Sequence, residues 1–169
     1  VKYDKIPVLK PAFKMDGVIT AANASKLNDG AAAVLVMSEE QAKELGYTPL
    51  AEIVSQASAA KQPVDFTIAP AESINKALRK ASLTSDDIDL YEINEAFAVV
   101  SLANNALLQL DPAKVNINGG AVALGHPIGA SGARVLVTLL HEMKRQNATY
   151  GLASLCIGGG EASALIVKR

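Results

Sequence analysis

The sequence has 169 residues, of which 50% are hydrophobic and 20% are charged, and its formal net charge is −1. A chain of this length can bury roughly 70% of the surface that its unfolded form exposes, so it can build a core without a disulfide or a metal. The charges form no long run of one sign, and no apolar stretch approaches the roughly 20 residues of a membrane span. We therefore expect one soluble globular domain that binds neither nucleic acid nor a membrane.

The ends of the chain and its cysteine content predict where the protein works. The single cysteine cannot form an intramolecular disulfide, and the first ten residues lack the pattern of a signal peptide. We expect a cytoplasmic protein, with an organellar matrix as the alternative. The chain begins with valine, which indicates a piece of a longer protein.

The first elements are predicted from an apolar run and a capping pattern. Ala31 to Met37 reads as a buried strand. Ser38 then caps a helix with Gln41 at the capping-box position, and Gly46 ends that helix.

The middle of the chain continues with alternating elements. Ile53 to Ser55 falls in a second strand, and Lys61 to Pro70 is a turn-rich connection with two prolines. Apolar residues at helical spacing predict an amphipathic helix from Pro70 onward: Ile74, Ala77, Leu78 and Ala81. Asp89 to Ile93 follows as a strand.

The last elements complete the pattern. Glu95 to Leu110 is apolar nearly all round, which is typical of a helix buried in a larger assembly. We expect a short strand at Val115 to Ile117, a helix at Ala133 to Lys144, and closing strands at Leu152 to Ile157 and Ala162 to Val167. This order predicts an α/β fold with a mixed, mostly parallel five-stranded sheet covered by helices, and the final hairpin makes one antiparallel edge.

Glycines gather in two loops that follow predicted strands. Five of the twelve glycines lie between Gly119 and Gly132, and three follow the only cysteine, Cys156. Ligands of α/β sheets bind at such loops. Cys156, His126 and Asn94 each stand where a strand gives way to a loop or a helix, and together they are candidates for catalysis.

Each candidate also has a structural explanation. A lone cysteine near a strand end is by default a small buried hydrophobe, a lone histidine is often structural, and Asn94 suits a helix N-cap. The sequence lacks a nucleophile elbow, HExxH, CxxC, a Walker lysine and the GxGxxG fingerprint. Serine hydrolysis, zinc hydrolysis, phosphoryl transfer and dinucleotide binding therefore lack their usual parts.

The ordered motifs resemble those of the C-terminal half of a thiolase. They are Asn94-Glu95-Ala96-Phe97-Ala98, Asn118-Gly119-Gly120-Ala121, Gly125-His126-Pro127-Ile128-Gly129-Ala130-Ser131-Gly132, Cys156-Ile157-Gly158-Gly159-Gly160, and the upstream run from Asn23 to Ala33. The resemblance covers about residues 17–169, with 1–16 as a connecting segment, and it makes the whole chain a thiolase C-terminal domain. It implies a thiolase-like half fold.

The resemblance implies Claisen condensation of two acetyl-CoA units to acetoacetyl-CoA and the reverse thiolysis, with no cofactor because the coenzyme A thioester is the substrate. Cys156 would be the acid/base thiol, and a stabilised thiolate is its reactive form. His126 would donate a hydrogen bond to the thioester oxygen and help to activate the nucleophile. Asn94 would hold the water that completes one oxyanion hole, and the N–H of Gly158 would serve a second.

Three further residues would bind the substrate in the same comparison. Ser25 would contact the pantetheine arm, while Ala96 and Phe97 would line the pocket. Core packing remains an equal explanation for Phe97, and Glu95 is expected only to shape a helix start.

The family forms its acyl-enzyme on another cysteine, in an N-terminal half that this chain lacks. We therefore expect the fragment to be inactive alone, to require its own N-terminal half as partner, and to form a homo-oligomer in the full-length protein. The alternatives are a 3-ketoacyl-CoA thiolase of longer chain preference and a non-catalytic acyl-CoA or lipid-binding module.

Overall fold

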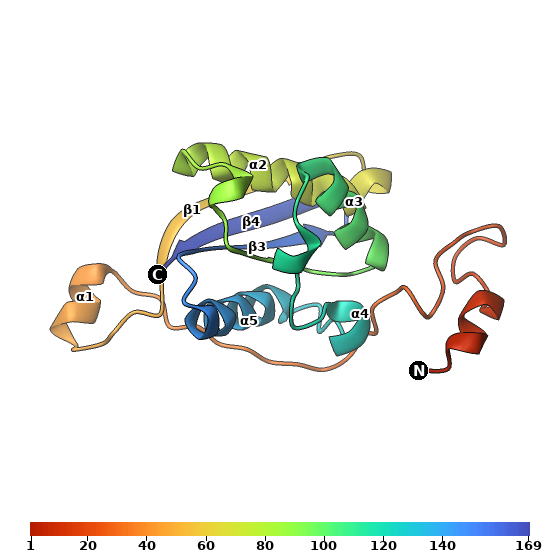
Figure 1. Cartoon of the computed structure of the whole chain (residues 1–169), viewed down its shortest axis with the longest axis horizontal. Coiled ribbons are helices and arrows are strands. Elements are labelled where there is room, and N and C mark those ends of the chain that lie inside the picture. Colours follow the sequence, from red (N-terminus) through yellow and green to blue (C-terminus); the bar gives the residue numbers. More distant parts are fainter.

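A four-stranded sheet with helices on both faces forms the centre of the molecule (Figure 1). The computed structural model describes all residues 1–169. The strands are β1 (Glu52–Ala60), β2 (Leu90–Ile93), β3 (Tyr150–Ile157) and β4 (Glu161–Lys168), in the spatial order β1-β4-β3-β2. Only β2 and β3 are parallel; β4 is antiparallel to both of its neighbours.

The predicted α/β class is confirmed, but the sheet has four strands rather than five and is not mostly parallel. The tight turn after β3 forces β4 to run back along it, and β1 then adds antiparallel to the far edge of β4.

The strand expected at Val115 to Ile117 is reduced to a single bridge between Val115 and Tyr91. Asn116 adopts a left-handed φ of 49°, which interrupts an extended strand. Its side chain takes over the pairing, because Oδ1 accepts the N–H of Ile93 at 2.9 Å and Nδ2 donates to the Ile93 carbonyl at 2.8 Å. An asparagine side chain therefore covers the outer edge of β2.

The strand expected at Ala31 to Met37 is also absent. The segment pairs with no strand of this chain, and its apolar side chains are open to solvent: Leu35 is 77% exposed and Val36 is 67% exposed. An apolar pattern indicates burial, and no surface within these 169 residues provides it.

Most helices form where the sequence predicts them. They are α1 (Glu39–Glu44), α2 (Ala69–Ala81), α3 (Ala98–Leu108), α4 (Ala121–Leu124) and α5 (Ser131–Gln146), with 3₁₀ turns at Tyr3–Val8, Pro63–Ile68, Ser85–Asp87 and Pro112–Lys114. The Ser38 hydroxyl accepts the N–H of Gln41 at 3.2 Å, as the capping pattern predicts. Helix α3 begins at Ala98 rather than Glu95, because the backbone before it is extended and pairs with the segment 23–25.

The two faces of the sheet carry separate cores. Helices α2 and α3 cover one face and α5 covers the other (Figure 1). The larger core lies under α2 and α3, where Ile74 and Leu152 are fully buried, and the smaller one lies under α5 around Leu139 and Met143. These layers fix the end of β2 and the first turn of α5, from which the candidate site is built. None of the helices has both the length and the apolarity required to cross a membrane.

Candidate active site

The parallel strands β2 and β3 bring two candidate residues to the same edge of the sheet. Asn94 follows β2 directly, and its backbone N–H donates to the carbonyl of Ser154 on β3 at 2.9 Å. Cys156 lies two residues further along β3. Because the carboxyl ends of parallel strands are where ligands bind in α/β sheets, the predicted edge placement of Asn94 and Cys156 fits a binding site.

His126 enters from the loop between α4 and α5. Gly125 makes the turn with a φ of +95°, and the backbone N–H of His126 donates to the carbonyl of Lys26 at 2.8 Å. The ring lies between two side chains: Nδ1 is 2.6 Å from the Ser131 hydroxyl, and Nε2 is 3.3 Å from the amide nitrogen of Asn94. The structure thus joins Asn94 and His126, which are 32 residues apart in the sequence.

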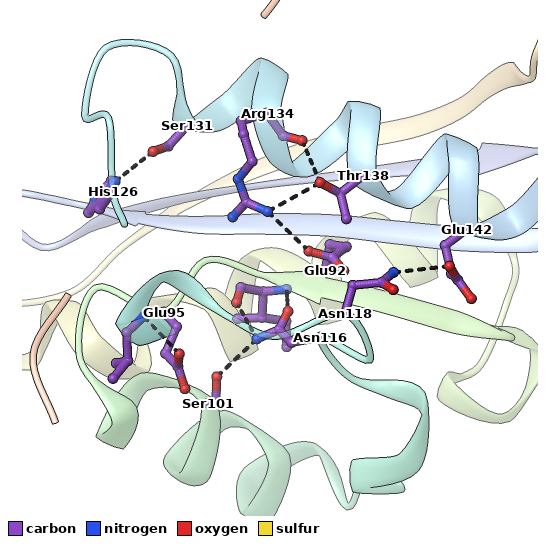
Figure 2. Close-up of polar contacts among 12 residues, drawn as sticks. Glu92, Glu95, Ser101, Asn116, Asn118, His126, Ser131, Arg134, Thr138 and Glu142 are labelled. Carbon is purple, nitrogen blue, oxygen red and sulfur yellow. Dashed lines mark hydrogen bonds and ion pairs between the residues drawn. The ribbon is translucent and has the colours of Figure 1, made fainter. Parts of the chain in front are cut away.

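The hydrogen bonds of Ser131 determine which ring nitrogen of His126 carries the hydrogen in the neutral form. The Ser131 hydroxyl donates its hydrogen to the carbonyl of Pro127 at 3.0 Å, so its oxygen is left to accept from Nδ1–H of His126. The neutral imidazole then presents Nε2 as an acceptor for the Asn94 amide. Burial, and after it the positive charge of Arg134, lowers the pKa of His126, which favours this neutral form. Figure 2 shows the contact between His126 and Ser131.

Cys156 is nearly covered by the larger core and is 9% exposed. Burial raises the pKa of its thiol, and a backbone hydrogen bond opposes this in part. The resting group is therefore a thiol at neutral pH. No side-chain hydrogen bond joins Cys156 to Asn94 or His126.

The three glycines after Cys156 do different things. Gly159 and Gly160 have φ values of 100° and 101°, and a Cβ on Gly160 would collide with the carbonyl of Lys61, whose N–H donates to the Gly160 carbonyl at 2.8 Å. Gly158 has an ordinary φ, and no atom lies within 4 Å of the position that its Cβ would occupy. The turn requires glycine at 159 and 160, whereas Gly158 faces open space.

The predicted substrate-binding residues are held together by the segment 23–27. The N–H of Ser25 donates to the carbonyl of Ala96 at 3.0 Å, and Ala24 forms an isolated bridge with Phe97. The same segment reaches the histidine loop through Lys26. It therefore fastens the loop after β2 to the loop that carries His126.

Sequence reasoning missed four residues around this site. Ser131 orients His126, Phe13 packs edge-on against Phe97 with centroids 5.9 Å apart, and Glu92 and Arg134 form an ion pair between β2 and α5. Spacing could have indicated one of them, because Glu92 stands two residues before Asn94, which places it on the same side of an extended chain. Ser131 follows His126 by five residues across a turn, a separation that no regular element predicts.

Glu95 does not shape the start of the helix that it was expected to begin, because α3 begins at Ala98. Its carboxylate instead accepts the N–H of Val122 in the first turn of α4 at 3.0 Å, and only a glycine fits at position 120 beside it. The structure brings together no group of three or more histidine, cysteine, aspartate or glutamate side chains that could hold a metal ion.

Two family models match the chain. The thiolase C-terminal domain matches residues 47–169, and the thiolase N-terminal domain matches residues 1–40. The chain is 59% identical over 166 residues to an acetyl-CoA acetyltransferase of Cupriavidus necator, covering 98% of this chain and 42% of that protein. It is 56% identical over 169 residues to a probable acetyl-CoA acetyltransferase of Dictyostelium discoideum, covering 100% of this chain and 41% of that protein.

Solved structures of thiolases have the same fold as this chain. The Bacillus anthracis acetyl-CoA acetyltransferase has a TM-score of 0.95 and 52% identity over 98% of this chain and 42% of its own. Human mitochondrial 3-ketoacyl-CoA thiolase in complex with CoA has a TM-score of 0.93 and 43% identity over 100% of this chain and 43% of its own. The chain belongs to the thiolase family, and it spans about two fifths of the length of the relatives it matches.

Proposed function

We propose that this chain supplies the acid/base half of a thiolase active site of the acetyl-CoA acetyltransferase type. The observation that carries the proposal is the hydrogen-bonded row of Asn94, His126 and Ser131 at the edge of the sheet where β3 carries Cys156, one residue before the strand ends. The reaction is the condensation of two acetyl-CoA units to acetoacetyl-CoA and its reverse. No cofactor is proposed, because the thioester itself is the substrate.

His126 has two successive roles in this proposal. Its neutral ring offers Nε2 as a base, which takes the proton of the nucleophilic thiol. The imidazolium that results carries a hydrogen on Nε2, and this hydrogen can be donated to the thioester oxygen as negative charge develops there. Asn94 keeps Nε2 oriented in the resting site and would hold the water of the same oxyanion hole.

Cys156 moves the second proton. In synthesis its thiol would first give a proton to the coenzyme A thiolate that leaves during acylation of the nucleophile, and the Cys156 thiolate that remains would take a proton from the methyl group of the second acetyl-CoA. In degradation its thiol would protonate the departing acetyl-CoA enolate, and its thiolate would then take the proton of the incoming coenzyme A thiol. The open space beside Gly158 supports a substrate oxygen near the backbone N–H of that residue. The raised pKa of Cys156 makes its thiolate a strong base once formed.

Substrate binding is assigned to the segment that joins the two loops. Ser25 would contact the pantetheine arm of coenzyme A, and Ala96 with Phe97 would line the pocket. The solved complex of a related human thiolase contains CoA, which supports coenzyme A thioesters as the substrate class.

The partner is an N-terminal thiolase half that carries the nucleophilic cysteine. Two exposed apolar surfaces support it: the run 31–37, and the outer side of α3, where Leu102 is 68% exposed and Leu107 is 59% exposed. Both were expected to be buried, and neither is covered within these 169 residues. In the full-length protein we propose a homo-oligomer that works in the cytoplasm, with an organellar matrix as the alternative.

A short acyl chain is favoured over a long one. Identity to the acetyl-CoA acetyltransferases is 52–59% in the four comparisons with bacterial and Dictyostelium or Yarrowia proteins, against 42–43% for the 3-ketoacyl-CoA thiolase structures. Rates with acetoacetyl-CoA and with a longer 3-ketoacyl-CoA would distinguish the two specificities directly.

The test is thiolysis of acetoacetyl-CoA by this chain combined with its N-terminal half. Cys156→Ala is expected to lower kcat by about 10²–10⁴-fold, the usual contribution of a general acid or base. His126→Asn should cause a loss of similar size, whereas His141→Asn, at an exposed position of α5, serves as the matched control and should retain activity. Full activity of Cys156→Ala would refute the acid/base role; binding of acyl-CoA without any turnover would favour the non-catalytic module.

A further inference from the structure

The segment 26–30 lies directly on the loop that carries His126. The Lys26 carbonyl accepts the N–H of His126 at 2.8 Å, and Leu27 forms an isolated parallel bridge with His126. Pro127, the next residue of the loop, is buried. The backbone of the segment and the backbone of the loop therefore run side by side.

The two backbones approach this closely because each has a glycine at the contact. A Cβ on Gly30 would lie 2.7 Å from both Cβ and Cγ of Pro127, and a Cβ on Gly125 would collide with the side chain of Asn28. Carbon atoms in contact are normally about 3.5–4.0 Å apart, so neither position accepts a side chain without movement. Gly125 has a left-handed φ, whereas Gly30 does not, so at position 30 the close approach to Pro127 alone requires glycine.

Pro127 connects this contact to the ring of His126. The Pro127 carbonyl accepts the hydroxyl hydrogen of Ser131 at 3.0 Å, and the oxygen of that hydroxyl is 2.6 Å from Nδ1 of His126 (Figure 2). Ser131 is 0% exposed, so water does not compete for its hydroxyl. An unbroken row of contacts thus leads from Gly30 through Pro127 and Ser131 to Nδ1.

The Ser131 hydroxyl has two alternative acceptors at this place. While the Pro127 carbonyl takes its hydrogen, its oxygen accepts Nδ1–H of His126, and Nε2 of the neutral ring is an acceptor. If the carbonyl moves away, the hydroxyl can rotate and donate to Nδ1, and the neutral ring then carries its hydrogen on Nε2. The position of Pro127 therefore selects the tautomer, and only the first tautomer has a base at Nε2.

We propose that Gly30 is a positioning residue for His126: it lets the segment 26–30 seat on Pro127, and this contact holds the ring in the Nδ1–H tautomer. Residues 1–40 match the thiolase N-terminal domain, whereas His126 lies in the part that matches the C-terminal domain. A segment related to the N-terminal half thereby sets the base of the C-terminal half. The catalytic consequence rests on the proposed function, but the tautomer is a property of this chain alone.

The experiment determines the tautomer of His126 by NMR. The 169-residue chain is labelled with ¹⁵N and studied at about pH 8, above the ordinary histidine pKa of about 6.5, so that the ring is neutral. The ¹⁵N chemical shifts of the ring distinguish a nitrogen that carries hydrogen from one that does not. Hydrogen exchange of the backbone amides is followed on the same samples, and the exposed His141 is the internal reference for the ring signals.

Gly30→Ala places a methyl group against Pro127 and should open the contact. The Nε2–H tautomer of His126 should then increase severalfold over the wild type. The amide of His126 should exchange roughly fivefold faster, the usual worth of one hydrogen bond, because the Lys26 carbonyl no longer accepts it. The amide of Ala98, which donates to Asn23 outside the contact, should exchange as before.

Gly129→Ala is the matched control in the same loop. Gly129 has an ordinary φ, and no atom lies within 4 Å of the position of its Cβ, so the variant should change neither the tautomer nor the exchange. An unchanged tautomer in Gly30→Ala would overturn the proposal even if the amide of His126 exchanged faster, because the segment would then only cover the loop. Equal changes in Gly129→Ala would also overturn it.

Ser131→Ala tests the same row of contacts from its other end and protects the test against misfolding of Gly30→Ala. Nδ1–H loses its acceptor, so the Nε2–H tautomer of His126 should increase, while the amide of His126 keeps the Lys26 carbonyl and its normal exchange. In the double variant Gly30→Ala with Ser131→Ala, the tautomer should shift no further than in Ser131→Ala, because both changes act on one link. An unshifted tautomer in Ser131→Ala, or a further shift in the double variant, would overturn the route through Ser131.

Kinetics in the assembled enzyme separates this inference from the proposed function. The amide of Ser25 is held by Ala96 rather than by the histidine loop, so Gly30→Ala should leave KM for acetoacetyl-CoA close to that of the wild type. Its kcat should fall by about 10–100-fold, as expected for a misplaced base. An unchanged kcat beside a changed tautomer would overturn the catalytic consequence. A wild-type assembly that shows no thiolysis refutes the proposed function, while the NMR measurements still decide the role of Gly30.

Discussion

Residues 1–50 and residues 51–169 follow different rules in this molecule. The second region forms a closed layered unit in which helices cover both faces of the sheet (Figure 1). The first contains one short α-helix and leaves most of its apolar side chains exposed, among them Met15 at 101% and Leu35 at 77%. Its apolar run 31–37 predicts a buried strand, yet nothing within the chain buries it.

The contacts between the two regions explain the difference. Asn23, Ser25 and Lys26 form backbone hydrogen bonds with the loop after β2 and with the histidine loop, which are parts of the candidate site. The first region therefore contributes to the site and little to the core.

The largest contrast is expected between Ile74→Ala and Leu35→Ala. Ile74 is 0% exposed in the larger core, so removing its methyl and methylene groups should lower the free energy of unfolding by about 2–5 kcal/mol. Leu35 is exposed in this chain, and its replacement should change stability by less than about 0.5 kcal/mol. Urea denaturation of both variants measures the difference.

Adding the N-terminal half should change only one of these results. If the run 31–37 is buried against that half, Leu35→Ala should weaken the assembly while its effect on the isolated chain stays small. Equal effects of Leu35→Ala with and without the N-terminal half would show that the run is not part of the interface.

The pH dependence of stability gives the next largest effect. The folded-state pKa of Glu92 is about 7, above its ordinary value of 4.5, because burial disfavours the carboxylate. The folded state therefore holds this proton more tightly than the unfolded state. The contribution is fully present below pH 4.5, falls as pH rises through 7, and amounts to about 3 kcal/mol at most.

Glu92→Gln should remove this dependence of the free energy of unfolding on pH. The free energy of unfolding of the variant, measured in urea between pH 5 and 8.5, should decline less with rising pH than that of the wild type. A wild-type slope that persists in Glu92→Gln would assign the effect to another group. Leu35→Ala, in the first region, should keep the wild-type slope.

The residues that the sequence identified are those with local signatures. Cys156 stands before three glycines, His126 precedes a proline, and Asn94 ends a strand, so each is recognisable from its neighbours. Arg134 and Ser131 could not be recognised in this way. They lie on one face of an amphipathic helix, and their importance depends on which strand the helix packs against.

The errors in the fold have a common cause. Ala31 to Met37 and Val115 to Ile117 both have strand-like composition, but a strand forms only where a partner can receive its hydrogen bonds. The first segment has no partner in this chain. The second contains Asn116, whose side chain forms hydrogen bonds with the backbone of Ile93 in place of a strand ladder. Helix α3 was placed three residues too early for the same reason, since pairing with the segment 23–25 keeps its first residues extended.

A smaller contrast is expected within the glycine turn of the second region. Gly160→Ala would place a Cβ at a φ of 101° and against the carbonyl of Lys61, so it should cost about 1–3 kcal/mol of stability. Gly158 has an ordinary φ, and its Cβ position faces open space, so Gly158→Ala should leave stability nearly unchanged. Thermal denaturation compares them, and equal losses would contradict the division of roles within the triglycine.

The smallest effect should come from removing residues 1–50. The core of the second region contains none of these residues, so the truncated chain should keep its far-UV circular dichroism spectrum.

The truncation should show locally in hydrogen exchange. The amides of Ala98 and His126 lose the carbonyls of Asn23 and Lys26 as acceptors, and each should lose protection worth about 1 kcal/mol, or roughly fivefold in hydrogen exchange. The amide of Asn116, which donates to Tyr91 within the second region at 2.9 Å, should exchange as before. Unfolding of the truncated chain would mean that the first region supports the core, whereas unchanged exchange at His126 would mean that the segment does not hold the histidine loop.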